Sequence, residues 1–469
     1  MKTYIDFKNR VKAGETTCEQ ELSSILAAIE SQKDLNAYLE LNEDAILSAR
    51  ESDKRFAAGN PRPLEGMLIA VKDNIFVKGM RATAASRMLE NYRPIFNATV
   101  VERLQQAGGI VVGKVNMDEL AMGSSNETSY FGGVKNPINK EYVSGGSSGG
   151  SAVAVAAGLA HTALGTDTGG SVRQPAALCG TVGFKPTYGR LSRYGVIAFA
   201  SSFDQVGIFS SNIEDTSLIF DVINGQDEND QTTAKLDAVN TFEKLNEDLP
   251  SKFKVGVLPD DMLKQLSADI LEVYESKLEQ LKAMGAEFHK IELINSEYWV
   301  PTYIVLTTVE ASSNLARLDG VRYGHHTDLV VDDVDYVALN RGEGFGDEVK
   351  RRILLGTHFL TSNSQNNYYD KAKQIRQLIT KSYAETFTKV DFMFLPTTAT
   401  AAFKANVKQD DPVKMYLSDF FTTSANLAGI PAISIPSGKN SLGLPIGMQL
   451  QAARFEENKL LRFAKALMK

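Results

Sequence analysis

The sequence predicts an α/β protein in which helices cover a β-sheet. A short apolar run at residues 67–71 ends at Lys72, as expected of a buried strand that delivers a charged side chain at its carboxyl end. Further along, a helical pattern of apolar residues stops at Gly108 and Gly109 and is followed by the apolar run 110–112. This succession is typical of the step from helix to strand in a wound sheet.

The first 60 residues are predicted to be a helical segment. Thr17 and Gln20 have the spacing of a capping box. Apolar residues then recur at the intervals of one helix face, at Leu22, Ile25, Leu26 and Ile29. Because no long linker rich in proline or serine interrupts the chain, residues 61–469 are predicted to form one continuous domain.

Two later segments predict helices and two predict loops. Residues 151–157 are small and apolar and follow a glycine-rich stretch, and residues 263–284 have the pattern of an amphipathic helix. The acidic residues 227–230 predict a solvated loop. The regularly spaced glycines of residues 342–346 predict a second loop.

Composition and charge argue against several classes of function. The 469 residues carry a formal net charge of −7, which disfavours a nucleic-acid-binding surface, so we expect any tRNA to be bound mainly by a partner. Because Cys18 and Cys179 are the only cysteines, we expect neither a disulfide framework nor a thiolate zinc site, and we predict a cytoplasmic location. The chain has no Walker motif and no run of about 18 apolar residues. We therefore expect no membrane span, no metal and no cofactor on this chain.

Two segments rich in glycine and serine indicate a hydrolase of amides. Residues 145–151 read GGSSGGS, and residues 165–175 read GTDTGGSVRQP. Glycine lets the backbone approach a reacting group closely, and its N–H groups can then point at the negative charge that develops during acyl transfer. Serine supplies a hydroxyl that can attack the carbonyl carbon.

Other interpretations exist for each of these features. A single glycine–serine segment is often a flexible surface loop, and residues 145–149 also fit the G-x-S-x-G nucleophile elbow. The elbow would make Ser147 the nucleophile and would require a histidine base with an acidic partner. The five histidines, none in a recognisable signature, are His161, His289, His325, His326 and His358. For Lys72 the alternative is a surface lysine paired with Asp73.

The two segments and Lys72 together resemble the hallmark of the amidase signature family. That hallmark is a serine-rich glycine loop, a second loop of the form Gly-x-Asp-x-Gly-Gly-Ser, and a distant lysine. The resemblance implies an α/β/α fold with a mixed central sheet covered by helices on both faces. It implies that Ser171 is the acyl-forming nucleophile, that Ser147 is a bridging serine after a cis peptide bond, and that Lys72 is the general base.

These roles make physical demands on the site. Lys72 must be neutral to accept a proton, so its pKa must fall from about 10.4 to near 7, which burial at a strand end can achieve. Ser147 would relay the proton from Ser171 to Lys72. Backbone N–H groups would form the oxyanion hole, at Thr168, Gly169, Gly170 and Ser171. Asp167 is expected to hold this loop by accepting backbone N–H bonds.

Four further segments resemble one branch of the family, whose members hydrolyse glutamine within a tRNA-dependent amidotransferase. They are residues 117–124, 188–195, 198–205 and 310–317. The resemblance implies that ammonia is released from glutamine through a glutamyl-enzyme and converts Glu-tRNA(Gln) to Gln-tRNA(Gln) on a partner. It implies a heterotrimer with a tRNA-binding B subunit and a small C subunit. The complex would require ATP and Mg²⁺ through the partner.

Glutamine carries a charged α-amino group and a charged α-carboxylate, so its pocket needs one anion and one cation. The resemblance makes Arg352 the cation, with Arg351 possible by a one-residue slip, Asp419 the anion, and Tyr303 part of the pocket wall. Two alternatives remain: a stand-alone amidase of the same fold that acts on small or aryl amides, and an inactive binding subunit. A neutral substrate would have no use for the charged pair, and the intact serines and lysine argue against an inactive subunit.

Overall fold

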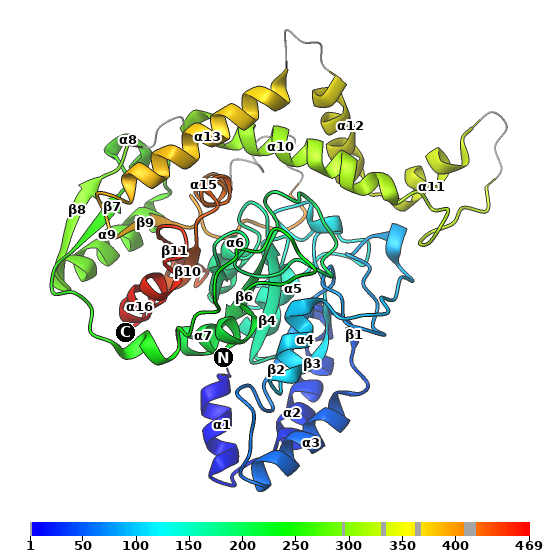
Figure 1. Cartoon of the computed structure of the whole chain (residues 1–469), viewed down its shortest axis with the longest axis horizontal. Coiled ribbons are helices and arrows are strands. Elements are labelled where there is room, and N and C mark those ends of the chain that lie inside the picture. The colour runs from blue at the N-terminus through cyan, green and yellow to red at the C-terminus, as the bar shows by residue number, and fades with distance from the viewer. Residues whose placement is uncertain (1, 293–295, 330–333, 362–366, 408–418) are drawn as a thin grey trace.

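One mixed β-sheet runs through the molecule (Figure 1). The computed structural model describes residues 2–292, 296–329, 334–361, 367–407 and 419–469. The strands in these ranges are β1 (Tyr38–Leu41), β2 (Leu68–Lys72), β3 (Ile110–Val115), β4 (Thr162–Asp167), β5 (Val182–Lys185), β6 (Gln205–Ser210), β7 (Phe253–Val257), β8 (Ala286–Lys290), β9 (Phe392–Pro396), β10 (Ala432–Lys439) and β11 (Pro445–Gln451). Their order across the sheet is β1-β3-β2-β4-β6-β5-β10-β11-β9-β7-β8.

The sheet combines parallel and antiparallel pairs, as the resemblance implied. Strand β2 is parallel to β3 and β4, and β7 is parallel to β8 and β9. The strands between these groups pair antiparallel, and β1 adds an antiparallel edge. Strands β2 to β6, β9 and β11 are buried along their whole length, which explains why β2, β3 and β9 are nearly continuous apolar runs.

Helices cover both faces of the sheet. They are α1 (Tyr4–Lys12), α2 (Cys18–Ser31), α3 (Ala45–Ala57), α4 (Thr99–Gln106), α5 (Gly149–Ala156), α6 (Arg173–Cys179), α7 (Ile213–Ile223), α8 (Asp260–Leu263), α9 (Ala268–Ala283), α10 (Trp299–Asn314), α11 (Tyr336–Gly344), α12 (Asp347–Thr361), α13 (Tyr368–Thr386), α15 (Phe420–Ala428) and α16 (Glu457–Leu467). Helices α5 and α6 pack together on strands near the centre, and α4, α7, α16 and α9 adjoin one another in a second group. In an outer group, α10 and α13 pack on α15, and α12 packs on α10 (Figure 1).

Local sequence signals located several elements. The apolar run 67–71 is β2, displaced by one residue so that Lys72 is its last member. The predicted step from helix to strand is α4 followed by β3, and the predicted capping box at Thr17 and Gln20 is present at the start of α2. The predicted helices at 151–157 and 263–284 correspond to α5 and α9, with shifted ends.

Two local predictions were wrong and a third held only in part. Residues 38–41 form strand β1 instead of continuing a helical segment, because β3 provides an edge with which they pair. Residues 342–346 form the end of α11 and the turn before α12 instead of a loop. Residues 227–230 form the predicted loop with Glu228 and Asn229 exposed, but Asp227 is buried and its carboxylate accepts hydrogen bonds from the hydroxyls of Thr99 and Ser192 at 2.5 and 2.6 Å. No helix in the described ranges has the length and apolar character needed to cross a membrane.

Candidate active site

The candidate site lies where two parallel strands end side by side. Strand β2 ends at Lys72, and its neighbour β4 ends at Asp167. The carboxyl ends of parallel strands meet at one edge of a sheet, so the lysine and the second glycine-rich loop converge. The first glycine-rich loop leads into α5, which begins at Gly149 and packs on both strands.

Lys72 is fully buried and contacts the first loop. Its Nζ donates hydrogen bonds to Ser147 Oγ at 2.8 Å, Ser148 Oγ at 2.8 Å and Thr166 Oγ1 at 2.9 Å. Burial lowers the pKa of Lys72 to about 7, although the negative charges of three buried aspartates raise it. A lysine with this pKa is partly neutral near pH 7, so it can accept a proton.

The surface-lysine interpretation does not describe Lys72. Asp73 is also buried, and its ion pair is with Lys114, whose Nζ lies 3.4 Å from Asp73 Oδ1. Lys114 also donates to backbone carbonyl groups of the loop that follows β2. This pair therefore fixes the loop next to Lys72 and leaves the Lys72 ammonium directed at the serines.

The peptide bond between Gly146 and Ser147 is cis, as the resemblance implied. The Ser147 side chain is buried and its hydroxyl hydrogen-bonds to Lys72, not to a histidine. The next residue joins the two glycine-rich loops, because the N–H of Ser148 donates to the carbonyl oxygen of Ser171 at 3.3 Å. This arrangement supports the serine–lysine interpretation over the nucleophile elbow.

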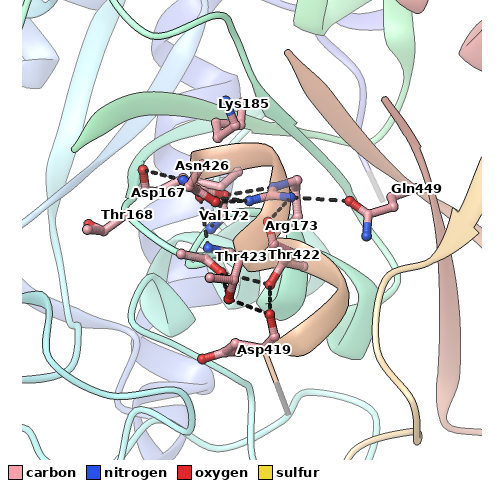
Figure 2. Close-up of polar contacts among 12 residues, drawn as sticks. Asp167, Thr168, Val172, Arg173, Lys185, Asp419, Thr422, Thr423, Asn426 and Gln449 are labelled. Carbon is pink, nitrogen blue, oxygen red and sulfur yellow. Dashed lines mark hydrogen bonds and ion pairs between the residues drawn. The ribbon is translucent and has the colours of Figure 1, made fainter. Parts of the chain in front are cut away.

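Asp167 organises the second loop, as expected (Figure 2). Its carboxylate accepts the N–H groups of Gly170 at 2.9 Å and Val172 at 3.2 Å. Arg173 adds two hydrogen bonds, at 3.0 and 3.1 Å. Burial alone would raise the pKa of Asp167, but the charge and hydrogen bonds of Arg173 hold it at about 2. Asp167 is therefore ionised at neutral pH and acts on the loop as a fixed anchor.

The loop places Ser171 at the edge of the site, where the residue is partly exposed. Within the described ranges, no hydrogen bond joins the hydroxyls of Ser171 and Ser147. The N–H of Gly170 is directed to Asp167, so of the four predicted oxyanion donors this one is engaged within the loop. Hydrogen bonds of catalytic groups are often long in ligand-free enzymes and tighten when substrate binds.

Two positions of this loop accept only glycine, because neighbouring side chains leave no space for a Cβ atom. A Cβ on Gly169 would lie 2.6–2.9 Å from atoms of the Tyr303 ring. Gly170 has a φ of +134°, and a Cβ there would overlap the side chain of Thr422. Tyr303 on α10 and Thr422 on α15 thus pack directly against the backbone that bears Ser171.

The predicted glutamine pocket adjoins this loop. Arg352 on α12 is 5% exposed, lies over the Phe199 ring, and donates from Nε to Glu348 Oε1 at 2.8 Å. Arg351 has a side chain that is 45% exposed, so burial favours Arg352 as the pocket cation. Asp419 immediately precedes α15. Burial raises the pKa of Asp419 to about 7, and the positive charge of Arg352 opposes this rise.

Two buried carboxylates near the site were not predicted as site residues. Asp118 accepts from the N–H of Asn126 at 3.0 Å, and its own N–H donates to the Ser147 carbonyl at 3.1 Å. Asp204 accepts from the Thr168 hydroxyl at 2.7 Å. Both belong to segments that supported the family resemblance, residues 117–124 and 198–205, but their spacing alone did not indicate contact with the loops.

The described residues contain no group of three or more histidine, cysteine, aspartate or glutamate side chains arranged to hold a metal ion. The candidate site presents serine hydroxyls, the amine of Lys72 and backbone N–H groups. A buried lysine of lowered pKa, a serine hydroxyl bonded to it and a glycine loop at a strand end form the arrangement expected of a hydrolase.

Comparison with known proteins agrees with this class. Residues 21–461 match the amidase family, and the chain belongs to that family. It is 49% identical, over 465 residues and 98% of both chains, to the A subunit of glutamyl-tRNA(Gln) amidotransferase from Chlorobium phaeobacteroides. The same subunit from Salinibacter ruber is 44% identical over 99% of both chains.

Solved structures show the same relationship. The crystal structure of the A subunit of glutamyl-tRNA(Gln) amidotransferase from Thermotoga maritima has a TM-score of 0.81 and 38% identity, covering 99% of this chain and 94% of that one. The peptide amidase of Stenotrophomonas maltophilia has a TM-score of 0.85 and 29% identity, covering 99% and 96%. The fold is therefore shared by an amidotransferase subunit and by a peptide amidase, so the fold alone does not decide between their functions.

Proposed function

We propose that this chain is the glutamine-hydrolysing subunit of a tRNA-dependent amidotransferase. One arrangement carries the choice of glutamine: Arg352 is a buried cation, and Asp419 is a partly exposed acid whose backbone the Thr422 hydroxyl joins to Gly169 in the loop of Ser171. Opposite charges at a fixed separation match the α-carboxylate and α-ammonium of an amino acid. The names of the 44–49% identical relatives support the same function.

The proposed reaction uses Ser171, Ser147 and Lys72 in sequence. The Ser171 hydroxyl attacks the side-chain amide carbon of glutamine, its proton passes to Ser147, and the Ser147 proton passes to neutral Lys72. Backbone N–H groups of the second loop stabilise the oxyanion of the tetrahedral intermediate. Lys72 returns the proton through Ser147 to the departing nitrogen, which releases ammonia and leaves a glutamyl ester on Ser171. Water then attacks the ester and glutamate is released.

The donors of the oxyanion hole are proposed to be the N–H groups of Thr168, Gly169 and Ser171. Gly170 supports them by its hydrogen bond to Asp167. The packing of Tyr303 against Gly169 makes the pocket wall continuous with the oxyanion loop. A substrate held between Arg352 and Asp419 would therefore present its amide next to Ser171.

Amidation itself requires a partner. The net charge of −7 and the lack of a phosphate-binding motif in the sequence support a division of labour. A tRNA-binding B subunit would bind the tRNA and use ATP and Mg²⁺ to activate the tRNA-bound glutamate, and a small C subunit would complete a heterotrimer. We place the assembly in the cytoplasm, in keeping with two buried free cysteines.

Replacing Arg352 by Ala should raise KM for glutamine by about 10–100-fold with little change in kcat, because the α-carboxylate contact is made in both the ground state and the transition state. Hydrolysis of an uncharged amide should change much less. Steady-state kinetics on both substrates would measure the difference. Arg351→Ala, which removes an exposed neighbour, is the matched control and should leave KM for glutamine unaltered. Equal losses on both substrates in Arg352→Ala would favour the stand-alone amidase instead.

The purified chain alone should hydrolyse glutamine but should not amidate Glu-tRNA(Gln). Addition of the partner subunits with ATP, Mg²⁺ and Glu-tRNA(Gln) should yield Gln-tRNA(Gln), measured by analysis of the aminoacyl group. A complex that carries Ser171→Ala should use free ammonium but not glutamine, because only the hydrolytic step is lost. Formation of Gln-tRNA(Gln) by the single chain would refute the division of labour.

A further inference from the structure

Asp419 is held by a serine from a distant part of the chain. Ser124 is 4% exposed, and its Oγ donates a hydrogen bond to Asp419 Oδ2 at 2.5 Å. The two residues are 295 positions apart in the sequence. A hydroxyl that donates to a carboxylate stabilises the ionised form and fixes the direction of the remaining lone pairs.

Gln174 joins Ser124 to the first glycine-rich loop. Its side-chain Nε2 donates to the carbonyl oxygen of Ser124 at 2.8 Å. Its Oε1 accepts the N–H of Gly146 at 3.0 Å, and Gly146 forms the cis peptide bond with Ser147. Gln174 is 1% exposed and lies in α6, three residues after Ser171. One amide side chain therefore connects Ser124 with the backbone on which Ser147 sits.

The backbone of Asp419 is connected to the second loop as well. The hydroxyl of Thr422 donates to the carbonyl oxygens of Gly169 at 2.7 Å and Asp419 at 3.0 Å. Thr423 also donates to the Asp419 carbonyl, at 2.6 Å (Figure 2). Asp419 is thus fixed at its backbone by α15 and at its carboxylate by Ser124.

We propose that Ser124 is a positioning residue for glutamine specificity, because it orients the Asp419 carboxylate toward the α-ammonium of the substrate. Gln174 holds Ser124 at a fixed position relative to the loop of Ser147. The inference rests on the proposed function, in which Asp419 binds that ammonium. One chain of hydrogen bonds then fixes the Asp419 carboxylate, which would bind the substrate, relative to Ser147, which would relay the proton. A neutral amide carries no ammonium group for this carboxylate to bind.

Electrostatics gives the proposal a measurable consequence. Burial raises the pKa of Asp419 to about 7, and the Ser124 hydrogen bond opposes this rise. The other charged groups that act on Asp419 are Arg352 on α12, Arg173 on α6 and Asp167 at the end of β4, and Tyr303 on α10 faces it as a neutral phenol. Loss of the Ser124 hydroxyl would raise the pKa further, so less of the carboxylate would be ionised at neutral pH and the ammonium would bind less well.

The test compares Ser124→Ala with the unaltered protein in the assembled enzyme, using glutamine and an uncharged amide. KM for glutamine should rise about tenfold, as expected for loss of one hydrogen bond to a charged group. The ratio of kcat/KM for glutamine to that for the uncharged amide should fall as pH is lowered through the pKa of Asp419. In Ser124→Ala this fall should occur at higher pH. Titration of Lys72 changes kcat/KM for both substrates by the same factor, so it does not alter the ratio.

Two variants separate positioning from stability. Ser129→Ala removes a buried hydroxyl from the same segment, where it donates to Asn116 at 2.7 Å, and it should lower Tm without raising KM for glutamine. Ser124→Thr retains the hydroxyl and should restore the pH dependence of the ratio. Gln174→Leu should both raise KM for glutamine and lower kcat for both substrates, because it releases the segment of Ser124 and the first glycine-rich loop.

An unchanged glutamine KM in Ser124→Ala, or an equal rise for the uncharged amide, would overturn the inference. The variant Asp419→Asn identifies which idea has failed. If Asp419→Asn leaves KM for glutamine unchanged, the proposed glutamine pocket is wrong. If Asp419→Asn raises KM but Ser124→Ala does not, the pocket stands and only the positioning role of Ser124 is refuted.

Discussion

Replacement of Ser171 by Ala is expected to lower glutamine hydrolysis by at least about 10⁴-fold, because it removes the atom that would form the ester. The fold should be retained, since Ser171 is partly exposed and the loop is held by Asp167 and by the packing of Tyr303 and Thr422. The assay is ammonia release under saturating glutamine, with thermal unfolding to verify the structure. A matched control is Ser151→Ala, whose hydroxyl donates to the Leu164 carbonyl and is expected to be dispensable for the chemistry.

Covalent trapping would identify the nucleophile directly. A glutamine analogue that carries a diazoketone in place of the amide should label Ser171, and peptide mass spectrometry would locate the adduct. The Ser171→Ala protein should not be labelled. An adduct on Ser147 would restore the nucleophile-elbow interpretation, even though the Ser147 hydroxyl hydrogen-bonds to Lys72 in the free protein.

Replacement of Lys72 by Met should lower kcat by about 10²–10⁴-fold, the usual contribution of a general base. Methionine is close to lysine in volume and apolar, so the buried site should tolerate it. In the unaltered protein, kcat/KM for an uncharged amide should rise with pH through about 7, because the neutral amine is the active form and burial lowers the pKa of Lys72 to that value. The residual activity of Lys72→Met should not show this rise of kcat/KM with pH.

Lys185 offers a control for the effect of removing any buried lysine. It is also fully buried, burial also lowers its pKa to about 7, and its Nζ donates to the carbonyl oxygens of Pro186 and Ile430 at 2.8 and 2.5 Å. Lys185→Met should reduce stability but keep most of the activity. If Lys185→Met loses as much activity as Lys72→Met, the loss in Lys72→Met is explained by removal of a buried charge and not by loss of proton transfer. A comparable loss in a single histidine variant would instead contradict a lysine base.

The location of the candidate catalytic groups could be predicted because each stands in a local pattern. An apolar run that ends in a lysine predicts a strand end, and consecutive glycines predict a backbone that approaches another group closely. Strand β2, the step from α4 to β3 and the capping box of α2 follow from the same local physics. The missed strand β1 has no such signal, because an edge strand of four residues depends on the neighbour with which it pairs.

The sequence by itself determined the fold class, the two glycine-rich loops and the presence of a lysine at a strand end, because these depend on residue type and short-range periodicity. Only the tertiary structure decided that β2 and β4 are neighbours, that Lys72 is fully buried beside Ser147, and that Arg352 is buried whereas Arg351 is half-exposed. It alone connected Ser124 to Asp419 across 295 positions. Burial, and with it the pKa of each group, is set by residues that are distant in the chain and close in space, so no local pattern can specify it.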